Sequence, residues 1–379
     1  MQPFDPEATV ARLKAAFYEL HSENKQGGTA IALYQGDHCL LTLHGGEASP
    51  GNPWTATNPC LIWSASKGVA AACVLHALQE NDIELQSPVS TLWPEFAANG
   101  KSQITLAELL SHRAGLAAIE EKGLSITDQE GVADALAAQS PNWDLEKSPA
   151  LHGYGARTFG FLLDEIIRRI TGKSLSSYWD QTFCKPLNLD LWFGLPKDRL
   201  EDAAMVIAPK TPPEPSDFSR AFGDPTSLTR RALSEPGGLL TPSVMNTPAM
   251  RMASIPSLGA IATADALARF YSMLANHNSF FTEKSHLQMQ TTLSQGIDLT
   301  LLARTSFSAG FMTNNYGAYG PSGTAFGHPG AGGSLGFADP ELGIGFAFIP
   351  SAMHPGALPG PRTQKLVQAL YGTRVLPQI

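Results

Sequence analysis

Patterns typical of β-strands occur near both ends of this chain, and a long stretch of mostly helical pattern separates them. Residues 28–46, "GTAIALYQGDHCLLTLHGG", contain two β-rich runs joined by Gly36-Asp37, a pair typical of a hairpin turn. Residues 333–351, "GSLGFADPELGIGFAFIPS", alternate small and apolar residues around an Asp-Pro turn, which indicates two antiparallel strands. The simplest assembly of these segments is an α+β protein with one antiparallel sheet made by both ends of the chain.

Helical patterns flank and separate the predicted strands. The first 20 residues and residues 361–372 predict a helix near each terminus, and apolar spacing predicts further helices over 159–170 and from Thr263. The segment that follows Ser64 is small or apolar nearly all round, so we expect a buried helix there. We therefore expect a sheet domain of residues 1–85 and 255–379, with a mostly helical domain of residues 86–254 inserted into it.

Charge and composition argue against several classes of partner. Hydrophobic residues make up 43% of the chain and charged residues 16%, which is typical of a globular protein. The formal net charge is −8, and no cluster of Lys and Arg is longer than the pairs Arg168-Arg169 and Arg230-Arg231. Neither nucleic acid nor an anionic membrane surface is therefore an expected partner.

The sequence predicts neither export nor a metal site. The N-terminal residues lack the basic start, apolar core and cleavage site of a secretory signal, and no run approaches the roughly 20 apolar residues that span a bilayer. The ten histidines include no His-x-x-x-His pair, and no cluster with cysteine, so neither a metal nor a cofactor is expected. Four scattered cysteines are expected to be buried free thiols of a cytoplasmic protein: Cys39, Cys60, Cys73 and Cys184.

A serine and a lysine stand in an otherwise apolar segment, "CLIWSASKGVAAACVLHAL", residues 60–78. Residues at i and i+3 share a helix face, so a helix that begins near Ser64 places its hydroxyl beside the amine of Lys67. Free N–H groups and the positive end of the helix dipole favour an oxyanion there. Burial lowers the pKa of a lysine, which lets it act as the base that a serine nucleophile needs. In the alternative interpretation, Ser64 caps the helix and Lys67 extends to solvent.

Two further segments offer groups for the same chemistry. Tyr154 precedes the predicted helix over 159–170, in a loop from which its phenol can enter a cleft, although a packing role is the alternative. His328-Pro329-Gly330 lies ahead of a predicted strand, and its glycine allows a ligand to approach the main chain closely. A backbone N–H at this point would complete an oxyanion hole with the N–H of Ser64.

Four segments, taken in order, resemble one enzyme superfamily. They are "SASK" at 64–67, "ITLAELLSHRAGL" at 104–116, "YGARTFGFLLDEIIRRITGKS" at 154–174 and "GHPGAGG" at 327–333. The set resembles the serine β-lactamase and penicillin-binding-protein superfamily. Within it, the chain is most similar to the family VIII carboxylesterases, esterases with a class C β-lactamase fold. The resemblance covers the chain from about residue 25 to residue 350.

This resemblance implies a β-lactamase-like fold and three catalytic residues. The fold would have an antiparallel sheet of about five strands flanked by the terminal helices, with the active site between the sheet domain and the helical domain. Ser64 would be acylated, and Lys67 would be its proton partner. Tyr154 would shuttle protons to the leaving group and activate water for deacylation. Which of Lys67 and Tyr154 is the formal base stays open, because coupled groups share their titration.

The resemblance also implies a substrate-binding edge, where the chain departs from the β-lactamase pattern. His328-Pro329-Gly330 takes the place of the Lys-Thr-Gly motif, and the N–H of Ala331 would complete the oxyanion hole. Ala156 stands where the β-lactamase pattern has Asn, which is the second departure from that pattern. His328, Gly330 and Ala156 are thus the expected substrate-binding positions. Because histidine is mostly neutral near pH 7, these departures favour uncharged esters over β-lactams.

Other candidate residues are interpreted as structural. Residues 332–336, "GGSLG", fit the Gly-x-Ser-x-Gly motif of α/β-hydrolases, and Asp339 and His354 follow in the order of that triad. That motif joins a strand to a helix, whereas Ser334 is followed by a strand-like segment and a turn. Ser66 is expected to form local hydrogen bonds, and His112 is expected to be packed.

Three functions remain open. The first is a carboxylesterase for small or medium acyl esters, with a small-molecule ester as its partner. The second is another enzyme that uses the same residues: an acyltransferase (transesterase), a β-lactamase or a D-amino-acid peptidase. The third is a non-catalytic binding protein, which would be expected to have lost the lysine or the tyrosine.

Overall fold

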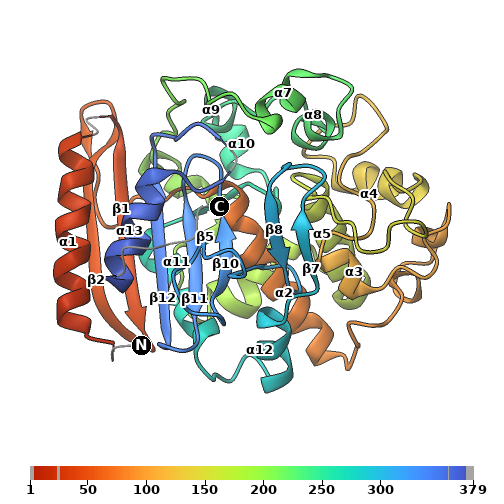
Figure 1. Cartoon of the computed structure of the whole chain (residues 1–379), viewed down its shortest axis with the longest axis horizontal. Coiled ribbons are helices and arrows are strands. Elements are labelled where there is room, and N and C mark those ends of the chain that lie inside the picture. The colour runs from red at the N-terminus through yellow and green to blue at the C-terminus, as the bar shows by residue number, and fades with distance from the viewer. Residues whose placement is uncertain (1–3, 24–25, 357, 373–379) are drawn as a thin grey trace.

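A nine-stranded sheet formed by both ends of the chain is the centre of the molecule (Figure 1). The computed structural model describes residues 4–23, 26–356 and 358–372. Neighbouring strands pair antiparallel throughout. In spatial order the strands are β3 (Asn52–Pro53), β2 (His38–Ser49), β1 (Gly28–Gln35), β12 (Ile344–Pro350), β11 (Leu335–Asp339), β10 (Phe326–Pro329), β9 (Met312–Thr313), β8 (Arg304–Phe307) and β7 (Ser294–Ile297).

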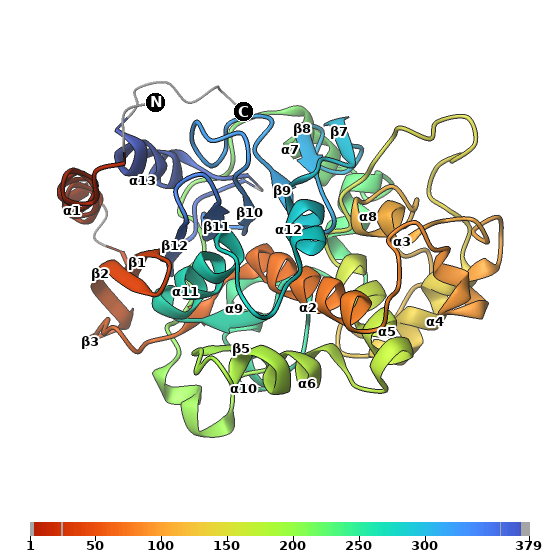
Figure 2. The same ribbon diagram turned by 90° about the horizontal axis from the view of Figure 1, so that it is seen from below.

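Helices lie on both faces of this sheet and are the main regular structure in the middle of the chain (Figures 1 and 2). The α-helices are α1 (Pro6–Glu23), α2 (Ser66–Glu80), α3 (Leu106–Leu110), α4 (Gln129–Ala138), α5 (Thr158–Thr171), α6 (Leu175–Trp179), α7 (Asp217–Gly223), α8 (Leu228–Ser234), α9 (Pro242–Met245), α10 (Pro248–Met252), α11 (Ala264–Ala275), α12 (Glu283–Gln290) and α13 (Pro361–Tyr371). Short 3-10 turns are η1 (Trp63–Ala65), η2 (Val89–Thr91), η3 (Pro94–Ala97) and η5 (Lys197–Asp202), and η4 (Asp180–Cys184) is a π-helical turn. A second sheet has the order β4 (Cys60–Leu61), β6 (Ala260–Ala262), β5 (Leu191–Phe193).

The predicted hairpin, the β11–β12 pair and the five predicted helices are confirmed, but the sheet has nine strands where about five were expected. The extra strands lie at its edges: β3 and β9 have two residues each, and β7 and β8 have four. Segments this short show too few alternating positions for a strand to be predicted.

Alternation of small and large residues in β11 and β12 decides which helices cover each face of the sheet. Phe337 pairs with Phe346, and both pack on the side of α1 and α13. Ala338 pairs with Gly345 on the opposite face, where α11 crosses the sheet. A Cβ on Gly345 would collide with the backbone nitrogen of Ser272 in α11. The small residues therefore let α11 approach closely, and Figure 2 shows the sheet between the two helix layers.

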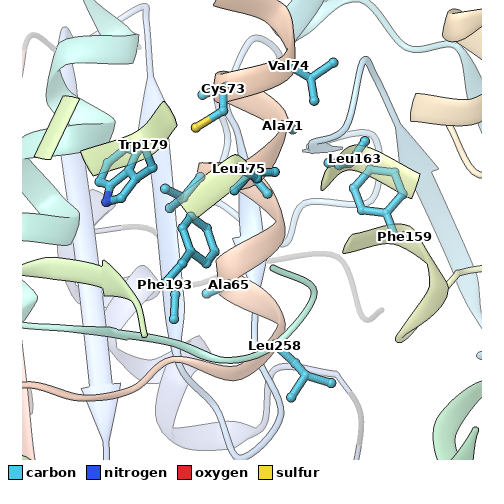
Figure 3. Close-up of a cluster of buried hydrophobic side chains, with 14 of the residues drawn as sticks. Ala65, Ala71, Cys73, Val74, Phe159, Leu163, Leu175, Trp179, Phe193 and Leu258 are labelled. Atoms are coloured by element: carbon cyan, nitrogen blue, oxygen red, sulfur yellow. The ribbon is translucent and has the colours of Figure 1, made fainter. Parts of the chain in front are cut away.

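Helix α2 is buried along most of its length, as its apolar sequence predicts. Figure 3 shows it between Phe159 and Leu163 of α5 on one side and Trp179 of α6 and Phe193 of β5 on the other. Its small residues, such as Ala71, allow these neighbours to pack closely. The start of α2, where Ser64 and Lys67 were predicted to meet, is thereby held on a rigid element.

Three of the four cysteines are buried free thiols, as expected, but Cys39 is exposed. Cys39 follows the hairpin turn at the start of β2, where consecutive side chains point to opposite faces, so its apolar neighbours did not imply its own burial. Within the described residues, no helix is long and apolar enough to cross a membrane. In that same part of the chain, His, Cys, Asp and Glu side chains form no group of three that could hold a metal ion.

Candidate active site

Ser64 lies in η1, the 3-10 turn that leads into α2. The preceding residue, Trp63, has a φ of +50°, in the left-handed region that few residues with side chains adopt. The hydroxyl of Ser66 donates to the carbonyl of Trp63 at 2.5 Å and accepts from the N–H of Ala260 at 3.0 Å. Ser66 is therefore the local hydrogen-bonding group that the sequence suggested, and it ties the turn bearing Ser64 to β6.

Lys67 is fully buried, and its amine has three oxygen neighbours. Nζ lies 2.8 Å from the carbonyl oxygen of Ala156, 2.8 Å from that of Ser257 and 3.3 Å from Oγ of Ser64. Carbonyl oxygens can only accept, so the first two contacts use two N–H bonds of the amine. A neutral amine has two N–H bonds and one lone pair, which leaves the lone pair for the hydroxyl of Ser64.

The environment of Lys67 favours the neutral amine. Burial, and then the positive charge of Arg157, hold the pKa of Lys67 well below its ordinary value. Arg157 is itself buried, and its guanidinium donates to the carbonyl oxygens of Ser234, at 2.8 Å, and Pro236. Arg157 was not among the residues predicted from the sequence to lie at the site. The available signal was a charged residue immediately ahead of the strongly apolar start of α5.

Tyr154 completes the group around Ser64. Its side chain is buried and hydrogen-bonded to Ser64, and Nζ of Lys67 lies 4.7 Å from the centre of its ring. Burial raises the pKa of Tyr154 above its ordinary value, by more than the hydrogen bond to Ser64 lowers it. The structure thus brings Ser64, Lys67 and Tyr154 together, with the tyrosine as a neutral phenol.

The loop that carries Tyr154 is held through three consecutive backbone N–H groups. Gly153 donates to the carbonyl of His112 at 3.1 Å, and Gly155 donates to Nδ1 of His112 at 3.2 Å. The N–H of Tyr154 donates to both carboxylate oxygens of Asp298, at 3.1 Å each. His112 is buried, as expected, but it also has a φ of +61° and supports the loop. Asp298 was not singled out in the sequence.

His328 lies beside Tyr154 rather than on an open surface. It is buried, and its ring stacks on that of Tyr154 with 5.9 Å between centroids. Its Nδ1 lies 2.7 Å from the carbonyl oxygen of Pro329, so Nδ1 carries the proton. Burial and then the charge of Lys67 lower the pKa of His328 to about 3, so the imidazole is neutral. The contact of His328 with substrate stays a prediction.

Gly330 lies against the turn that carries Ser64. A Cβ on Gly330 would collide with the carbonyl oxygen of Ile62 and with Oγ of Ser334. The N–H of Gly330 donates to the carbonyl of Ser334 at 2.7 Å. What approaches this glycine is thus the chain's own turn that carries Ser64. Ala331 follows directly, and its N–H has no hydrogen-bond partner in the part of the chain that the structure describes.

Ser334 and its two possible partners do not form a triad. Ser334 is buried, and its hydroxyl donates to the carbonyl of Ile62 at 2.7 Å. Asp339, at the other end of β11, accepts from the hydroxyl of Tyr371 at 2.7 Å. His354 lies beside Gly360 instead. Ser334 therefore has a structural role in joining β11 to the turn that carries Ser64.

Comparisons with known proteins show the family of this chain. A family model described as Beta-lactamase matches residues 10–370. Esterase/beta-lactamase LipL of Mycobacterium tuberculosis is 30% identical over 349 residues, which cover 88% of this chain and 79% of that protein. Two solved structures are 29% identical to the chain and cover 96% of it and 97% of their own chains. They are a penicillin-binding protein homolog from Caulobacter crescentus, with a TM-score of 0.87, and a family VIII carboxylesterase, with a TM-score of 0.86.

These matches extend over nearly the whole chain, so the family is not inferred from the four motifs alone. The resemblance and the β-lactamase-like fold predicted from the sequence are confirmed. The chain belongs to the beta-lactamase family, within the serine β-lactamase and penicillin-binding-protein superfamily, and is a hydrolase.

Proposed function

We propose that the protein is a serine carboxylesterase that hydrolyses small or medium acyl esters through an acyl-enzyme on Ser64. The arrangement around Lys67 carries this proposal. Two carbonyl oxygens, each 2.8 Å from Nζ, use both N–H bonds of the neutral amine, and the lone pair is left for the hydroxyl of Ser64 at 3.3 Å. The esterase name of the M. tuberculosis relative and the likeness to a family VIII carboxylesterase support it.

In the acylation step, Oγ of Ser64 bonds to the ester carbonyl carbon while Nζ of Lys67 takes the hydroxyl proton. The carbonyl electron pair moves onto oxygen, where the N–H groups of Ser64 and Ala331 stabilise the oxyanion. As the oxyanion collapses, the bond to the alcohol oxygen breaks, and the phenol of Tyr154 gives that oxygen a proton. The resulting phenolate regains a proton from the ammonium of Lys67, whose Nζ lies 4.7 Å from the ring centre.

In the deacylation step, water takes the place of the alcohol. Tyr154 and Lys67 remove its proton as its oxygen bonds to the acyl carbon, and the second tetrahedral intermediate collapses to release the acid. The proton returns to Oγ of Ser64. Neither step consumes a cofactor, and both use the same oxyanion position.

The charges around Ser64 favour uncharged substrates. His328 is neutral, because its pKa is lowered to about 3, and the pKa of Lys67 is also lowered. Arg157 directs its guanidinium at the carbonyls of Ser234 and Pro236. The site therefore offers little fixed positive charge to a substrate carboxylate, which is why we favour neutral esters over β-lactams.

The test is intact-protein mass after treatment with a fluorophosphonate, together with turnover of p-nitrophenyl acetate and butyrate. Wild type, Ser64→Ala and Ser334→Ala would be compared. One adduct, mapped to Ser64, that forms on wild type and Ser334→Ala but not on Ser64→Ala, with turnover abolished in Ser64→Ala, supports the proposal. An adduct on Ser334, or no adduct and no turnover, contradicts it. A chromogenic β-lactam, and an added alcohol as acceptor, would then rank the β-lactamase and acyltransferase alternatives.

A further inference from the structure

Asp298 lies between β7 and β8, and its carboxylate is completely buried. It accepts hydrogen bonds from the N–H of Tyr154 at 3.1 Å, of Thr300 at 2.8 Å and of Leu301 at 2.9 Å. The hydroxyl of Thr305 adds a fourth donor at 3.3 Å. Every one of these partners donates a hydrogen bond to Asp298. The ionised carboxylate, which only accepts, is therefore the form of Asp298 that suits them. Burial raises the pKa of Asp298, and these N–H donors act against that rise.

His152 fixes the orientation of this carboxylate through Thr305. Nε2 of His152 lies 2.7 Å from Oγ1 of Thr305 and 3.7 Å from Oδ2 of Asp298. Thr305 has one hydroxyl proton, which it donates to Asp298, so it accepts from Nε2–H of His152. The N–H of Leu299 in turn donates to the carbonyl of His152 at 3.0 Å. The Asp298 carboxylate is therefore bound by Thr305, and Thr305 is in turn fixed by its hydrogen bond to His152.

Tyr154 needs such an anchor because glycine precedes and follows it. Glycine has wide conformational freedom, so this loop would sample many backbone geometries if its N–H groups were free. His112 binds the two glycines, Gly153 and Gly155, but the N–H of Tyr154 itself is bound by Asp298. The position of the Tyr154 Cα, and hence the reach of its phenol to Ser64, depends on that carboxylate.

We propose that Asp298 is a positioning residue that holds Tyr154 where its phenol can protonate the leaving alcohol. This inference rests on the role given to Tyr154 under the proposed function. The negative charge of Asp298 also acts in the same direction as burial, which raises the pKa of Tyr154, and so helps to keep the phenol protonated.

The test uses two esters that share one acyl group, p-nitrophenyl butyrate and ethyl butyrate. p-Nitrophenolate leaves without a proton, whereas ethanol leaves only when an acid protonates it. The kcat/KM value reports the acylation half-reaction, so loss of the acid lowers it far more for the ethyl ester. We expect both Tyr154→Phe and Asp298→Asn to lose at least about tenfold more activity on ethyl butyrate than on p-nitrophenyl butyrate.

The matched control is Asp164→Asn. Asp164 is a second buried carboxylate that accepts from a backbone N–H, that of Leu175 at 2.7 Å, but it lies within α5 and away from the loop of Tyr154. A purely structural loss of activity lowers kcat/KM equally for the two esters. Titration with the fluorophosphonate corrects each variant for its active fraction. We expect Asp164→Asn to keep the wild-type ratio of the two kcat/KM values.

The outcomes separate the two proposals. A selective loss in Tyr154→Phe with an unchanged ratio in Asp298→Asn overturns the positioning role and leaves the esterase mechanism intact. No selective loss in Tyr154→Phe overturns its role as the acid, and the positioning role with it. If Asp298→Asn does not fold, Thr305→Val removes one donor from Asp298, and a selective loss of about threefold is then expected. A wild-type ratio in folded Thr305→Val also overturns the inference.

Discussion

The main chain at Gly330 lies directly against the carbonyl group of Ile62, two residues before Ser64. Gly330 leads into Ala331, whose N–H is the second proposed oxyanion donor, while Ile62 leads into the turn that carries Ser64, the proposed nucleophile. Ser334 joins the same two segments, because its hydroxyl donates to the Ile62 carbonyl and its own carbonyl accepts from Gly330. The two N–H groups of the proposed oxyanion hole, those of Ser64 and Ala331, thus come from segments that are held together by the contact between Gly330 and Ile62.

Gly330→Ala should break this contact. The new Cβ would collide with the Ile62 carbonyl oxygen and the Ser334 hydroxyl oxygen, so the turn or the strand must move. We expect kcat/KM to fall by about 100-fold, because small displacements of catalytic groups are costly. The control is Gly323→Ala, whose Cβ enters open space. Wild-type kcat/KM in Gly330→Ala would contradict the arrangement.

The acidic limb of the pH–rate profile should respond to Arg157. In the proposed mechanism the neutral amine of Lys67 is the active form, so kcat/KM should fall as the pH drops through the pKa of Lys67. The charge of Arg157 lowers that pKa. Removing it in Arg157→Gln stabilises the ammonium, raises the pKa of Lys67 and moves the limb to higher pH, whereas Arg157→Lys keeps the charge. A limb that stays in place or moves to lower pH in Arg157→Gln counts against Lys67 as the base.

Ser257→Ala should lower both stability and turnover. The Ser257 hydroxyl donates to the carbonyl of Arg157 and accepts from the N–H of Gly160 at 2.7 Å, while its carbonyl binds Lys67. Loss of the hydroxyl leaves two buried groups unpaired, so we expect the free energy of unfolding to fall by about 2 kcal/mol. Turnover should fall as well, because the carbonyl that orients Lys67 is displaced.

A matched serine separates these two effects. The buried hydroxyl of Ser272 donates to the carbonyl of Gly36 at 2.8 Å, away from the candidate site. Ser272→Ala should therefore lose stability, measured by urea unfolding, while it keeps the wild-type kcat. Equal effects of Ser257→Ala and Ser272→Ala on kcat would show that the Ser257 hydroxyl does not orient Lys67.

Alkylation of the native protein by iodoacetamide should stop at one thiol. Cys39 is exposed, whereas burial raises the pKa of Cys60 to about 12 and that of Cys184 to about 11, and also raises that of Cys73. Intact mass should show one adduct under native conditions, none in native Cys39→Ser, and four for the denatured wild type, which has four cysteines. More than one adduct on the native protein would contradict the burial of Cys60, Cys73 and Cys184.

The parts of the fold that could be predicted are those whose pattern is local. α5 and α11 repeat apolar residues at helical spacing, and β11 and the first five residues of β12 alternate small and large residues. Edge strands of two to four residues could not be predicted, because their pairing depends on neighbours already in place. Ser64 and Lys67 could be paired because only three residues separate them.

The supporting residues could not be predicted, since their partners are remote in the sequence. Asp298 binds a residue 144 positions away, and the carbonyl of Ser257 binds Lys67 across 190 positions. Ala156 shows a different limit. Its side chain was considered for substrate contact, but its carbonyl accepts from Lys67, a role set by backbone geometry rather than by residue type. Substrate contact by Ala156 and Gly330 stays a prediction.

The pairing of β1 with β12 has a consequence for how the protein is made. A ribosome delivers Ser64 and Lys67 early, yet β12, which pairs with β1, and β10, which contacts the turn that carries Ser64, are translated near the end. Until then, the nascent chain carries the apolar surface of α2 without the strand β10 that helps to cover it, a state prone to aggregation. Ester turnover should therefore appear only after residue 350 has left the exit tunnel, which makes activity a readout of completed translation.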